Sequence, residues 1–387
     1  MHIAIIAEYN PFHKGHAYQI DTLRRNFGDD ARISIILGGI FSQRGEPYVS
    51  TPYIRANAAL SSGADLVLEM PFPFSCAPAS IFARAGVEIA KSIGADILAF
   101  GSECGDTEKL TAIQEKLDSK EFAAAISKKK RESDTLGRTR VCSETFKELF
   151  GDIFETDKPN DILAIEYIRA IKSLGAKIKP YAILRRGDYK SGEGEFASAT
   201  SLRRDYAAGG IDAIKHGIPD SAFEIFSDAQ KCGLLFPDFD RLSSAALLKL
   251  AENTGPSSLA FSSSGIIGRL KSAAKKSSSI TELLTHSATK RYTDAELSRA
   301  LLYTLFSVSK SELDEPVYYT RLLAANKRGR EVLSGINIEL ITKPSDTKDL
   351  SAKAVAQYER TFIAERAYAL TLDGKYEHKC MTPKVLD

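Results

Sequence analysis

Residues 3–16 read IAIIAEYNPFHKGH, and this stretch decides the fold of the chain. The apolar run at residues 3–7 predicts a buried β-strand, and Pro11 prevents that strand from continuing. A helix then begins at the histidines, so the sequence predicts a strand, a short turn and a helix N-terminus in immediate succession. The free N–H groups and the dipole of such a helix end favour a bound anion, typically a phosphate.

His13 and His16 are the candidate catalytic residues at this helix end. Residues three apart share one face of the first turn, so both imidazoles can reach the same triphosphate, while Gly15 permits close approach. Two other interpretations exist for the pair: ordinary helix-start histidines, or a metal site. We expect no metal, because no third ligand is close in sequence and the glutamate of the metalloprotease motif is absent.

The same alternation of strand and helix continues as far as about residue 208. Further strands are expected at residues 33–37, 65–70, 96–100 and 178–184, and helices at 15–25, 53–61, 79–93, 161–174 and from 201 onwards. Short apolar runs separated by amphipathic helices are typical of a parallel sheet with helical crossovers. The sequence therefore predicts a Rossmann-like α/β domain over residues 1–208.

Helical periodicity dominates the chain after residue 210. Thr293 and Glu296 form a capping box ahead of an apolar stripe, and residues 351–370 give a second amphipathic pattern. A short strand is expected at residues 336–341, and the segment SAAKKSSS at residues 272–279 is typical of a loop. We expect residues 211–387 to form a second, mostly α-helical domain.

The composition is that of a soluble globular protein, with 43% hydrophobic and 26% charged residues in 387. No apolar run approaches the roughly 20 residues that a transmembrane helix needs, and the first residues lack the basic leader of a signal peptide. The five cysteines occur singly, which indicates reduced thiols rather than disulfides or a zinc ribbon. They are Cys76, Cys104, Cys142, Cys232 and Cys380. We therefore expect a cytoplasmic protein without membrane contact.

A second candidate phosphate motif lies at residues 198–204, SATSLRR. Its serines and threonine offer donors at a helix start, and Arg203 or Arg204 adds a cation that can face phosphates. Taken alone, the segment is equally an N-capped helix with exposed arginines. Paired with the HxGH motif, it resembles the second half of a nucleotidyltransferase site, in which both motifs clamp ATP during in-line attack on the α-phosphate. Thr200 and Arg203 are the further catalytic candidates.

Five more stretches narrow the family. They are FSQRGEP at residues 41–47, GADLVLEMP at 63–71, FGSECGD at 100–106, PNDILAIEY at 159–167 and RRGDY at 185–189. Together with residues 7–16 they closely resemble the bacterial tRNA(Met) cytidine acetate ligase family. The matches run in order from residue 3 to about residue 204, whereas the C-terminal half matches in helical character and carries no sharp motif.

The resemblance implies a two-step reaction. In that family, acetate and ATP form acetyl-adenylate and pyrophosphate, and the acetyl group then passes to N4 of the wobble cytidine of elongator tRNA(Met), which gives N4-acetylcytidine. Acetyl-CoA is not used. Mg²⁺ is expected to accompany ATP, held by the phosphates more than by protein ligands.

The resemblance also assigns residues. ATP binding falls on Ala7, Glu8, Tyr9, Asn10, Pro11, Phe12, His13, Lys14, Gly15, His16, Ala17, Tyr18, Gln19 and Ile20. Gly101 lets the nucleotide approach the backbone, Asn160 contacts the nucleotide, and Arg185 together with Arg186 binds phosphate or adenylate. The alternatives are a simple turn at Gly101, a helix cap at Asn160 and a solvated arginine pair. Since ionised acetate is already a nucleophile, catalysis needs neutralisation of the triphosphate, by the two histidines on one side and Thr200 with Arg203 on the other.

Contact with tRNA requires local basic surfaces, because 52 Lys and Arg residues against 50 Asp and Glu residues give a net charge of only +2. Three clusters are candidates, and each could instead be a solvated helix face. The first is Lys128, Lys129, Lys130 and Arg131 with Arg138 and Arg140; the second is Lys271, Lys275 and Lys276 with Arg269; the third is Arg321, Lys327, Arg328 and Arg330.

Two rival functions remain open at this point. One is an adenylyltransferase acting on a phosphorylated small metabolite, which would use the same two motifs. The other is an RNA- or nucleotide-binding protein without catalysis. The sequence leaves open the acetate pocket, the acceptor of the amine proton and the oligomeric state.

Overall fold

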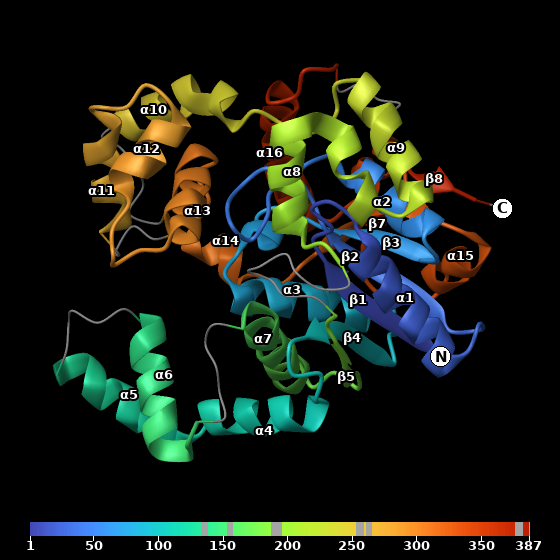
Figure 1. Cartoon of the computed structure of the whole chain (residues 1–387), viewed down its shortest axis with the longest axis horizontal. Coiled ribbons are helices and arrows are strands. Elements are labelled where there is room, and N and C mark those ends of the chain that lie inside the picture. Colours follow the sequence, from blue (N-terminus) through green and yellow to red (C-terminus); the bar gives the residue numbers. More distant parts are fainter. Residues whose placement is uncertain are drawn as a thin grey trace.

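A mostly parallel β-sheet forms the centre of the computed structural model (Figure 1). The structure describes residues 1–132, 138–152, 158–186, 196–252, 259–260, 265–375 and 382–386. The strands are β1 (His2–Ala7), β2 (Arg32–Gly38), β3 (Leu66–Met70), β4 (Ile97–Ser102), β5 (Lys179–Leu184), β6 (Tyr319–Ala325), β7 (Glu339–Ile341) and β8 (Lys384–Val385). Their order is β5-β4-β1-β2-β3-β6-β7, with β8 beside β6. The first five strands are parallel, and β6 runs antiparallel to β3.

Alternating side chains of β1 enter two different hydrophobic cores, as the period of two along a strand requires. Ile3 and Ile5 pack in the core that includes α1 (Lys14–Phe27), α2 (Pro52–Ser61) and α9 (Asp220–Lys231). Ala4 and Ile6 pack on the opposite face. Helices therefore cover both faces of the sheet, which is why its strands are continuously apolar.

The opposite face is covered by α3 (Ala79–Ser92) and α7 (Pro159–Ser173). The chain passes outward from β1 through β2 to β3, and then returns to place β4 on the other side of β1. This reversal opens a crevice between the carboxyl ends of β1 and β4, and ligands of open α/β sheets bind at such a point. The topology thus directs the search for a site to the residues that follow Ala7 and Phe100.

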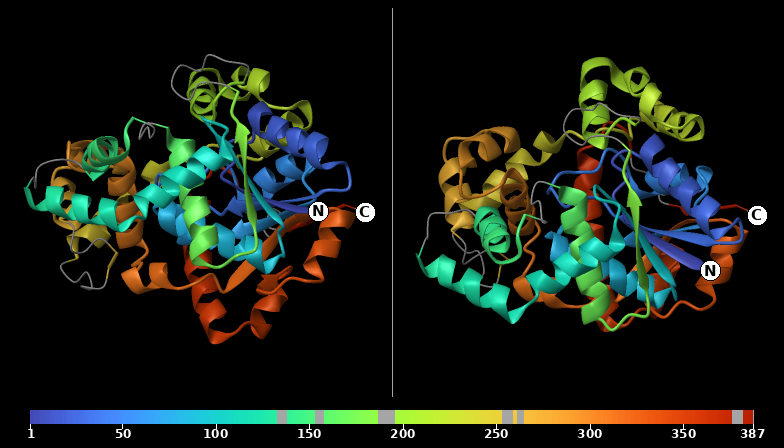
Figure 2. Two further views of the ribbon diagram at one scale, coloured as in Figure 1. Left: turned by 90° about the horizontal axis from the view of Figure 1, so that it is seen from below. Right: turned by 60° about the horizontal axis from the view of Figure 1, so that its bottom comes forward.

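Two groups of helices lie on the side toward which the parallel strands point (Figures 1 and 2). One group is an arm of α4 (Thr107–Leu117), α5 (Lys120–Glu132) and α6 (Arg138–Phe150). The other is a bundle of α10 (Ser243–Ala251), α11 (Ile266–Ala274), α12 (Ile280–Ser287) and α13 (Asp294–Leu305), which has its own hydrophobic core. No helix in the described ranges is both long enough and apolar enough to span a bilayer.

The remaining helices connect these parts. They are α8 (Ala199–Ala213), α14 (Lys310–Asp314), α15 (Lys327–Leu333), α16 (Ala352–Leu370) and the 3₁₀ turns Phe74–Cys76, Lys215–Gly217, Phe239–Leu242 and Pro344–Asp349. The expected capping box is present, with Thr293 as the N-cap of α13 and Glu296 as its partner. The expected loop at residues 272–279 is wrong in its first part, because α11 continues to Ala274.

The α/β fold predicted from the first 208 residues is confirmed, but the sheet does not end there. The apolar strand β6, which the sequence analysis did not predict, joins β3 as the next strand, and β7 is shorter than the expected strand at residues 336–341. The mostly helical C-terminal half therefore completes the sheet of the N-terminal half. Its helices are not built around a sheet of their own in the described part of the chain.

A buried ion-pair triad fastens this added strand. Arg321 of β6 donates to Glu69 of β3, with one N···O distance of 2.8 Å, and to Glu365 of α16 at 2.9 Å. The three side chains are 5%, 0% and 2% exposed. The expectation that Arg321 contacts RNA is therefore wrong, because this residue lies inside the protein between two carboxylates.

We expect Arg321→Ala to lower the free energy of unfolding by about 3–5 kcal/mol, since it leaves two buried carboxylates without their cation. The control is Arg32→Ala, which breaks an ion pair with Glu331 whose side chains are 44% and 53% exposed. That pair is worth at most about 1 kcal/mol. Urea unfolding of both variants measures the difference, and equal losses would contradict a stabilising role for the triad.

Candidate active site

The two histidines form the N-terminus of α1 and cap it with their own side chains. His13 is the N-cap residue, and its Nδ1 accepts the Gly15 N–H at 3.0 Å. The Nδ1 atom of His16 accepts the His13 N–H at 3.2 Å. Because each Nδ1 is an acceptor, the proton of each neutral ring lies on Nε2. The sequence motif thus supplies two Nε2–H donors at a helix end.

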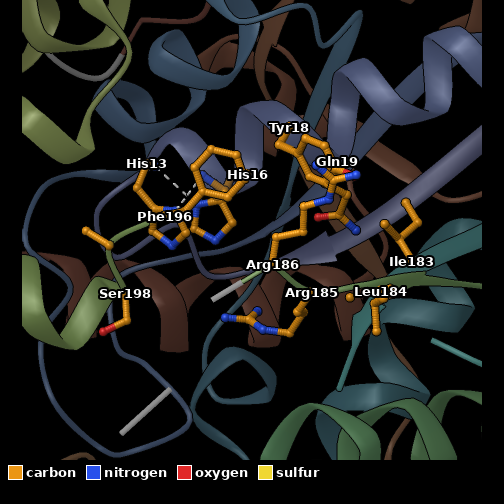
Figure 3. Close-up of a pocket in the computed structure, with 13 residues that line it drawn as sticks. His13, His16, Tyr18, Gln19, Ile183, Leu184, Arg185, Arg186, Phe196 and Ser198 are labelled. Carbon is orange, nitrogen blue, oxygen red and sulfur yellow. Dashed lines mark hydrogen bonds between the residues drawn. The ribbon is translucent and has the colours of Figure 1, made fainter. Parts of the chain in front are cut away.

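The imidazoles stack on one another and are held neutral (Figure 3). Their ring centroids are 3.7 Å apart at an interplanar angle of 23°. Burial, aided by the charge of Arg185, lowers the pKa of His13 to about 3. Burial and then the charges of His13 and Arg185 hold the pKa of His16 well below its ordinary value. Near pH 7 the pair therefore offers neutral donors rather than two cations.

The position of the His13 ring requires glycine at residue 15, in addition to any need for close approach of a ligand. A Cβ atom at this position would lie 2.9 Å from Cε1 and 3.0 Å from Nδ1 of His13. Any side chain would push the His13 ring out of its place. Tyr9 supports the pair from behind, with its ring centroid 4.5 Å from that of His16.

A cleft opens at the carboxyl ends of β1 and β4, where the topology places it. It adjoins a smaller pocket, with which it shares the lining residues His13, His16, Gly101 and Arg185 (Figure 3). The expected residues that line the large cleft are Ala7, Glu8, Tyr9, Asn10, His13, His16, Gln19, Gly101, Asn160, Arg185, Thr200 and Arg203. Those that line only the smaller pocket are Gly15, Tyr18 and Arg186.

The other residues of the expected ATP-binding run line neither space. Phe12 and Ile20 are core residues, and Lys14 is exposed to solvent. Pro11 and Ala17 also face elsewhere. The reason for Lys14, Ala17 and Ile20 is helical geometry, because within α1 only His16 and Gln19 share with the N-cap His13 the face toward the large cleft.

The second motif meets the first across the cleft. Ser198 caps α8 by accepting the Ser201 N–H at 3.1 Å. Arg203 donates to the backbone oxygen of Asn10 at 2.8 Å and approaches Thr200 Oγ1 at 3.4 Å. The neighbouring Arg204 is 76% exposed and pairs with a surface aspartate. The structure therefore brings Arg203, and not Arg204, to the phosphate motif.

Asn160 holds Arg185 at the opposite wall, and it is not a simple helix cap. Its side-chain amide donates to Glu103, and its Oδ1 accepts from Arg185 at 3.3 Å. Glu103 also accepts the Asp161 N–H at 2.8 Å. Gly101 leaves room for the same arginine, since a Cβ there would meet Arg185 Cγ at 3.3 Å. Glu103 belongs to the family motif FGSECGD, but nothing in its local sequence indicates this positioning role.

The loop at residues 41–47 also lines the cleft, through Ser42, Gln43 and Arg44. Glu8 Oε1 positions it by accepting the Gln43 N–H at 2.8 Å and the Tyr48 hydroxyl at 2.9 Å. The family motif FSQRGEP was the available signal for this loop. Another part of the large cleft was not predicted and is mainly apolar. It is lined by Phe82, Phe100, Leu163 and Tyr167.

The expected basic clusters differ in where the structure places them. Lys128 and Lys129 lie on α5, and Lys129 pairs with Glu148 at 2.6 Å; the side chains of Lys130, Arg131, Arg138 and Arg140 lie outside the described residues. Lys275 and Lys276 are exposed at the end of α11, whereas Lys271 donates to a backbone oxygen at 3.2 Å. Arg269 bonds backbone oxygens of the same bundle.

Lys327, Arg328 and Arg330 lie on α15, beyond the edge of the sheet opposite to the cleft. The reason is the antiparallel direction of β6, whose last residue pairs with the first residue of β3. Among the residues that the structure describes, no group of three or more His, Cys, Asp or Glu side chains could hold a metal ion.

Comparison with known proteins gives one consistent result. The family model of the HIGH nucleotidyltransferases matches residues 1–382. The tRNA(Met) cytidine acetate ligase of Caldanaerobacter subterraneus subsp. tengcongensis is 32% identical over 95% of this chain and 94% of its own. That of Listeria monocytogenes is 33% identical over 88% and 89%. Thermotoga maritima TmcAL, crystallised with alpha-thio ATP, has the same fold, with a TM-score of 0.90, 23% identity and full coverage of both chains.

We expect the free energy of unfolding to fall as the pH is lowered from about 7.5 to about 5. The pKa of His13 is about 3 in the folded chain against an ordinary value of 6.5. Below pH 6.5 the unfolded chain therefore binds a proton that the folded chain does not, which costs up to about 1.4 kcal/mol per pH unit. The contribution of neutral His13 to the free energy of unfolding is complete above pH 6.5 and declines as the pH falls toward 3. Urea unfolding across this range measures the slope.

His13→Asn is the informative variant, because asparagine keeps an acceptor at the N-cap and removes the imidazole. It should reduce the slope without abolishing it, since burial also lowers the pKa of His2 and of His16. An undiminished slope in His13→Asn would show that His13 is not buried as a neutral group.

Proposed function

The chain belongs to the tRNA(Met) cytidine acetate ligase family of the HIGH nucleotidyltransferases, and we propose that it carries out both steps of that reaction. It activates acetate with ATP, and it transfers the acetyl group to N4 of the wobble cytidine of elongator tRNA(Met). The observation that carries the proposal is the convergence of two neutral imidazole donors with two guanidinium groups, Arg185 and Arg203, on one cleft.

In the first step, an acetate oxygen forms a bond to the α-phosphorus as the bond to the β-phosphate oxygen breaks. Pyrophosphate leaves, and acetyl-adenylate remains. Acetate is ionised at neutral pH, so no base is needed; what the site must supply is stabilisation of charge on the transferring and leaving phosphates. The Nε2–H groups of His13 and His16 supply donors at the helix end, and Arg185 and Arg203 supply cations on the two walls.

Fixed positions make these donors effective, because preorganised groups need no reorganisation during the reaction. Arg203 is held by the Asn10 carbonyl, and Arg185 by the Asn160 amide. Thr200 lies beside Arg203 and offers a hydroxyl. Mg²⁺ bound with ATP would neutralise phosphate charge and would take its ligands mainly from the phosphates.

In the second step, the exocyclic amine of the cytidine attacks the acetyl carbonyl. The C–N bond forms, AMP leaves and the amine loses a proton. The acetyl group reaches the site as acetate, so acetyl-CoA has no part in the proposal. The cytidine has to be unstacked to reach the mixed anhydride, as other enzymes that act on a base require.

The tRNA lies, in this proposal, on the side of the molecule toward which the parallel strands point. The arm with Lys128 and Lys129 and the bundle with Lys271, Lys275 and Lys276 both lie on that side (Figures 1 and 2). Lysines on two separate supports can follow a phosphate backbone. Arg328, on the far edge of the sheet, is the expected tRNA contact that this geometry favours least.

The function is tested by exchange of labelled pyrophosphate into ATP. We expect exchange to depend on acetate, and labelled acetate with ATP and total tRNA to give N4-acetylcytidine. His16→Gln should lower acetate-dependent exchange by about 10²–10³-fold, the usual effect of removing one transition-state donor, while tRNA binding stays unchanged. Exchange that required a phosphorylated acceptor in place of acetate would overturn the proposal, and equal loss of tRNA binding would overturn the role of His16.

The tRNA surface is tested separately, by replacing Lys275 and Lys276 together with alanine. Each lost phosphate contact should reduce the slope of log affinity against log salt by about 1, and the KM for tRNA should rise. Acetate-dependent pyrophosphate exchange without tRNA should not change. The comparison variant replaces Lys327 and Arg328 on α15 with alanine. It should change neither the salt slope nor the KM for tRNA. The opposite outcome would place the RNA at the other edge of the sheet.

A further inference from the structure

A contiguous apolar wall forms part of the large cleft and has no role in nucleotide binding as described above. It consists of Ile6 from β1, Phe82 from α3, Phe100 from β4 and Leu163 from α7. All four pack in the core that covers the α3 and α7 face of the sheet. The histidines stand at the start of α1, which covers the other face. The cleft therefore has a polar part at the helix end and an apolar part behind it.

Tyr167 belongs to the same wall, one helical turn after Leu163. The residue is 2% exposed, and its ring centroid is 5.8 Å from that of Phe100. The hydroxyl is buried without a hydrogen-bond partner among the described residues. Buried hydroxyls in native proteins usually have a hydrogen-bond partner, and an acceptor oxygen of a ligand in the cleft would supply one.

The hydroxyl is a donor at neutral pH, because burial raises the pKa of Tyr167 well above its ordinary value. Tyr9 also has a buried hydroxyl without a described partner, but its ring lies against His16 on the nucleotide side. A donor set within an apolar wall fits a small molecule with an acceptor oxygen and a short alkyl group. A short-chain carboxylate has that composition.

We propose that the wall of Ile6, Phe82, Phe100 and Leu163 binds the alkyl group of the carboxylate substrate, and that the Tyr167 hydroxyl donates to one of its carboxylate oxygens. This assignment rests on the proposed function, which puts the carboxylate beside the α-phosphate. Glu8 also lines the cleft, and its Oε1 is already occupied by the Gln43 N–H and the Tyr48 hydroxyl. Arg185, which lines the same cleft, is the cation available to the substrate carboxylate.

The wall then determines which acids are activated. Ile6, Phe82 and Phe100 are at most 7% exposed and sit in close-packed surroundings that cannot yield easily. One methylene more or less in a hydrophobic pocket changes the specificity by about 10–200-fold. Leu163 is only partly buried, so it is the wall residue whose truncation least endangers folding.

The test compares acetate, propionate and butyrate in ATP–pyrophosphate exchange at saturating ATP. Leu163→Ala should raise the kcat/KM for propionate relative to acetate by about 10-fold or more, with the KM for ATP within about twofold of the unmodified chain. Leu174→Ala is the matched control, since Leu174 is a partly buried leucine at the end of the same helix that does not line the cleft. It should leave the ratio unchanged. Leu163→Val replaces Leu163→Ala if the latter fails to fold.

Tyr167→Phe removes only the unpaired hydroxyl and should raise the KM for acetate about 10-fold, without changing the KM for ATP or the melting temperature. Tyr319→Phe is its control, because that buried hydroxyl donates to Thr361 at 2.8 Å and Tyr319 does not line the cleft. It should lower the melting temperature and leave the KM for acetate unchanged. Normal acetate and propionate kinetics in both cleft variants would overturn the assignment of the wall alone, whereas absence of carboxylate-dependent exchange in the unmodified chain would overturn the proposed function with it.

Discussion

The guanidinium of Arg55 is buried where β1 and β2 end, and its hydrogen bonds go to backbone carbonyls. It is 0% exposed and donates to Glu8 O at 2.6 Å and to Gly38 O at 2.8 Å, with a further bond to Ser50 O at 3.2 Å. A buried cation is costly unless such partners surround it, so these carbonyls are held in fixed positions as long as Arg55 stays inside. The ends of two strands and the start of α2 thereby become one rigid frame, and the turn that leads to His13 begins from it.

The site is built outward from this frame by further backbone contacts. Asn10, in the turn after β1, accepts the Val49 N–H through Oδ1 at 2.8 Å and accepts Arg203 through its backbone oxygen. The loop at residues 41–47 is held on one side by Glu8 and on the other by α13, where Ser298 donates to Gly45 O at 3.1 Å. Gly45 has a φ of +78°, and a Cβ there would clash with the α13 backbone at 2.5 Å. The helical bundle proposed to bind tRNA thus rests directly on a loop that lines the nucleotide cleft.

How much of this could be read from the sequence depended on the range of the interactions. The parallel strands were predictable because each is a short apolar run, and the helix-end histidines because their spacing is local. Strand β6 was not predictable, since Arg321 interrupts its apolar run and its partners Glu69 and Glu365 are 252 and 44 residues away. An arginine near the first motif could be predicted, because a triphosphate site needs cations. The choice between Arg203 and Arg204 could not, because it depends on which face of α8 is turned toward the cleft. The position of Arg185 depends on Asn160 and Glu103, which only the folded chain brings together.

The histidine pair shows why this site combines neutral and charged donors. Two imidazolium rings could not stack at a centroid separation of 3.7 Å without strong repulsion, so the stacked geometry itself requires neutrality. Burial and the charge of Arg185 produce that neutrality, and Gly15 permits the ring position that accepts the helix N–H. Positive charge is instead placed at the two walls, on guanidinium groups that do not lose their protons. The polar end of the cleft can therefore crowd several donors around one phosphate, which a cluster of four cations in the same space could not do.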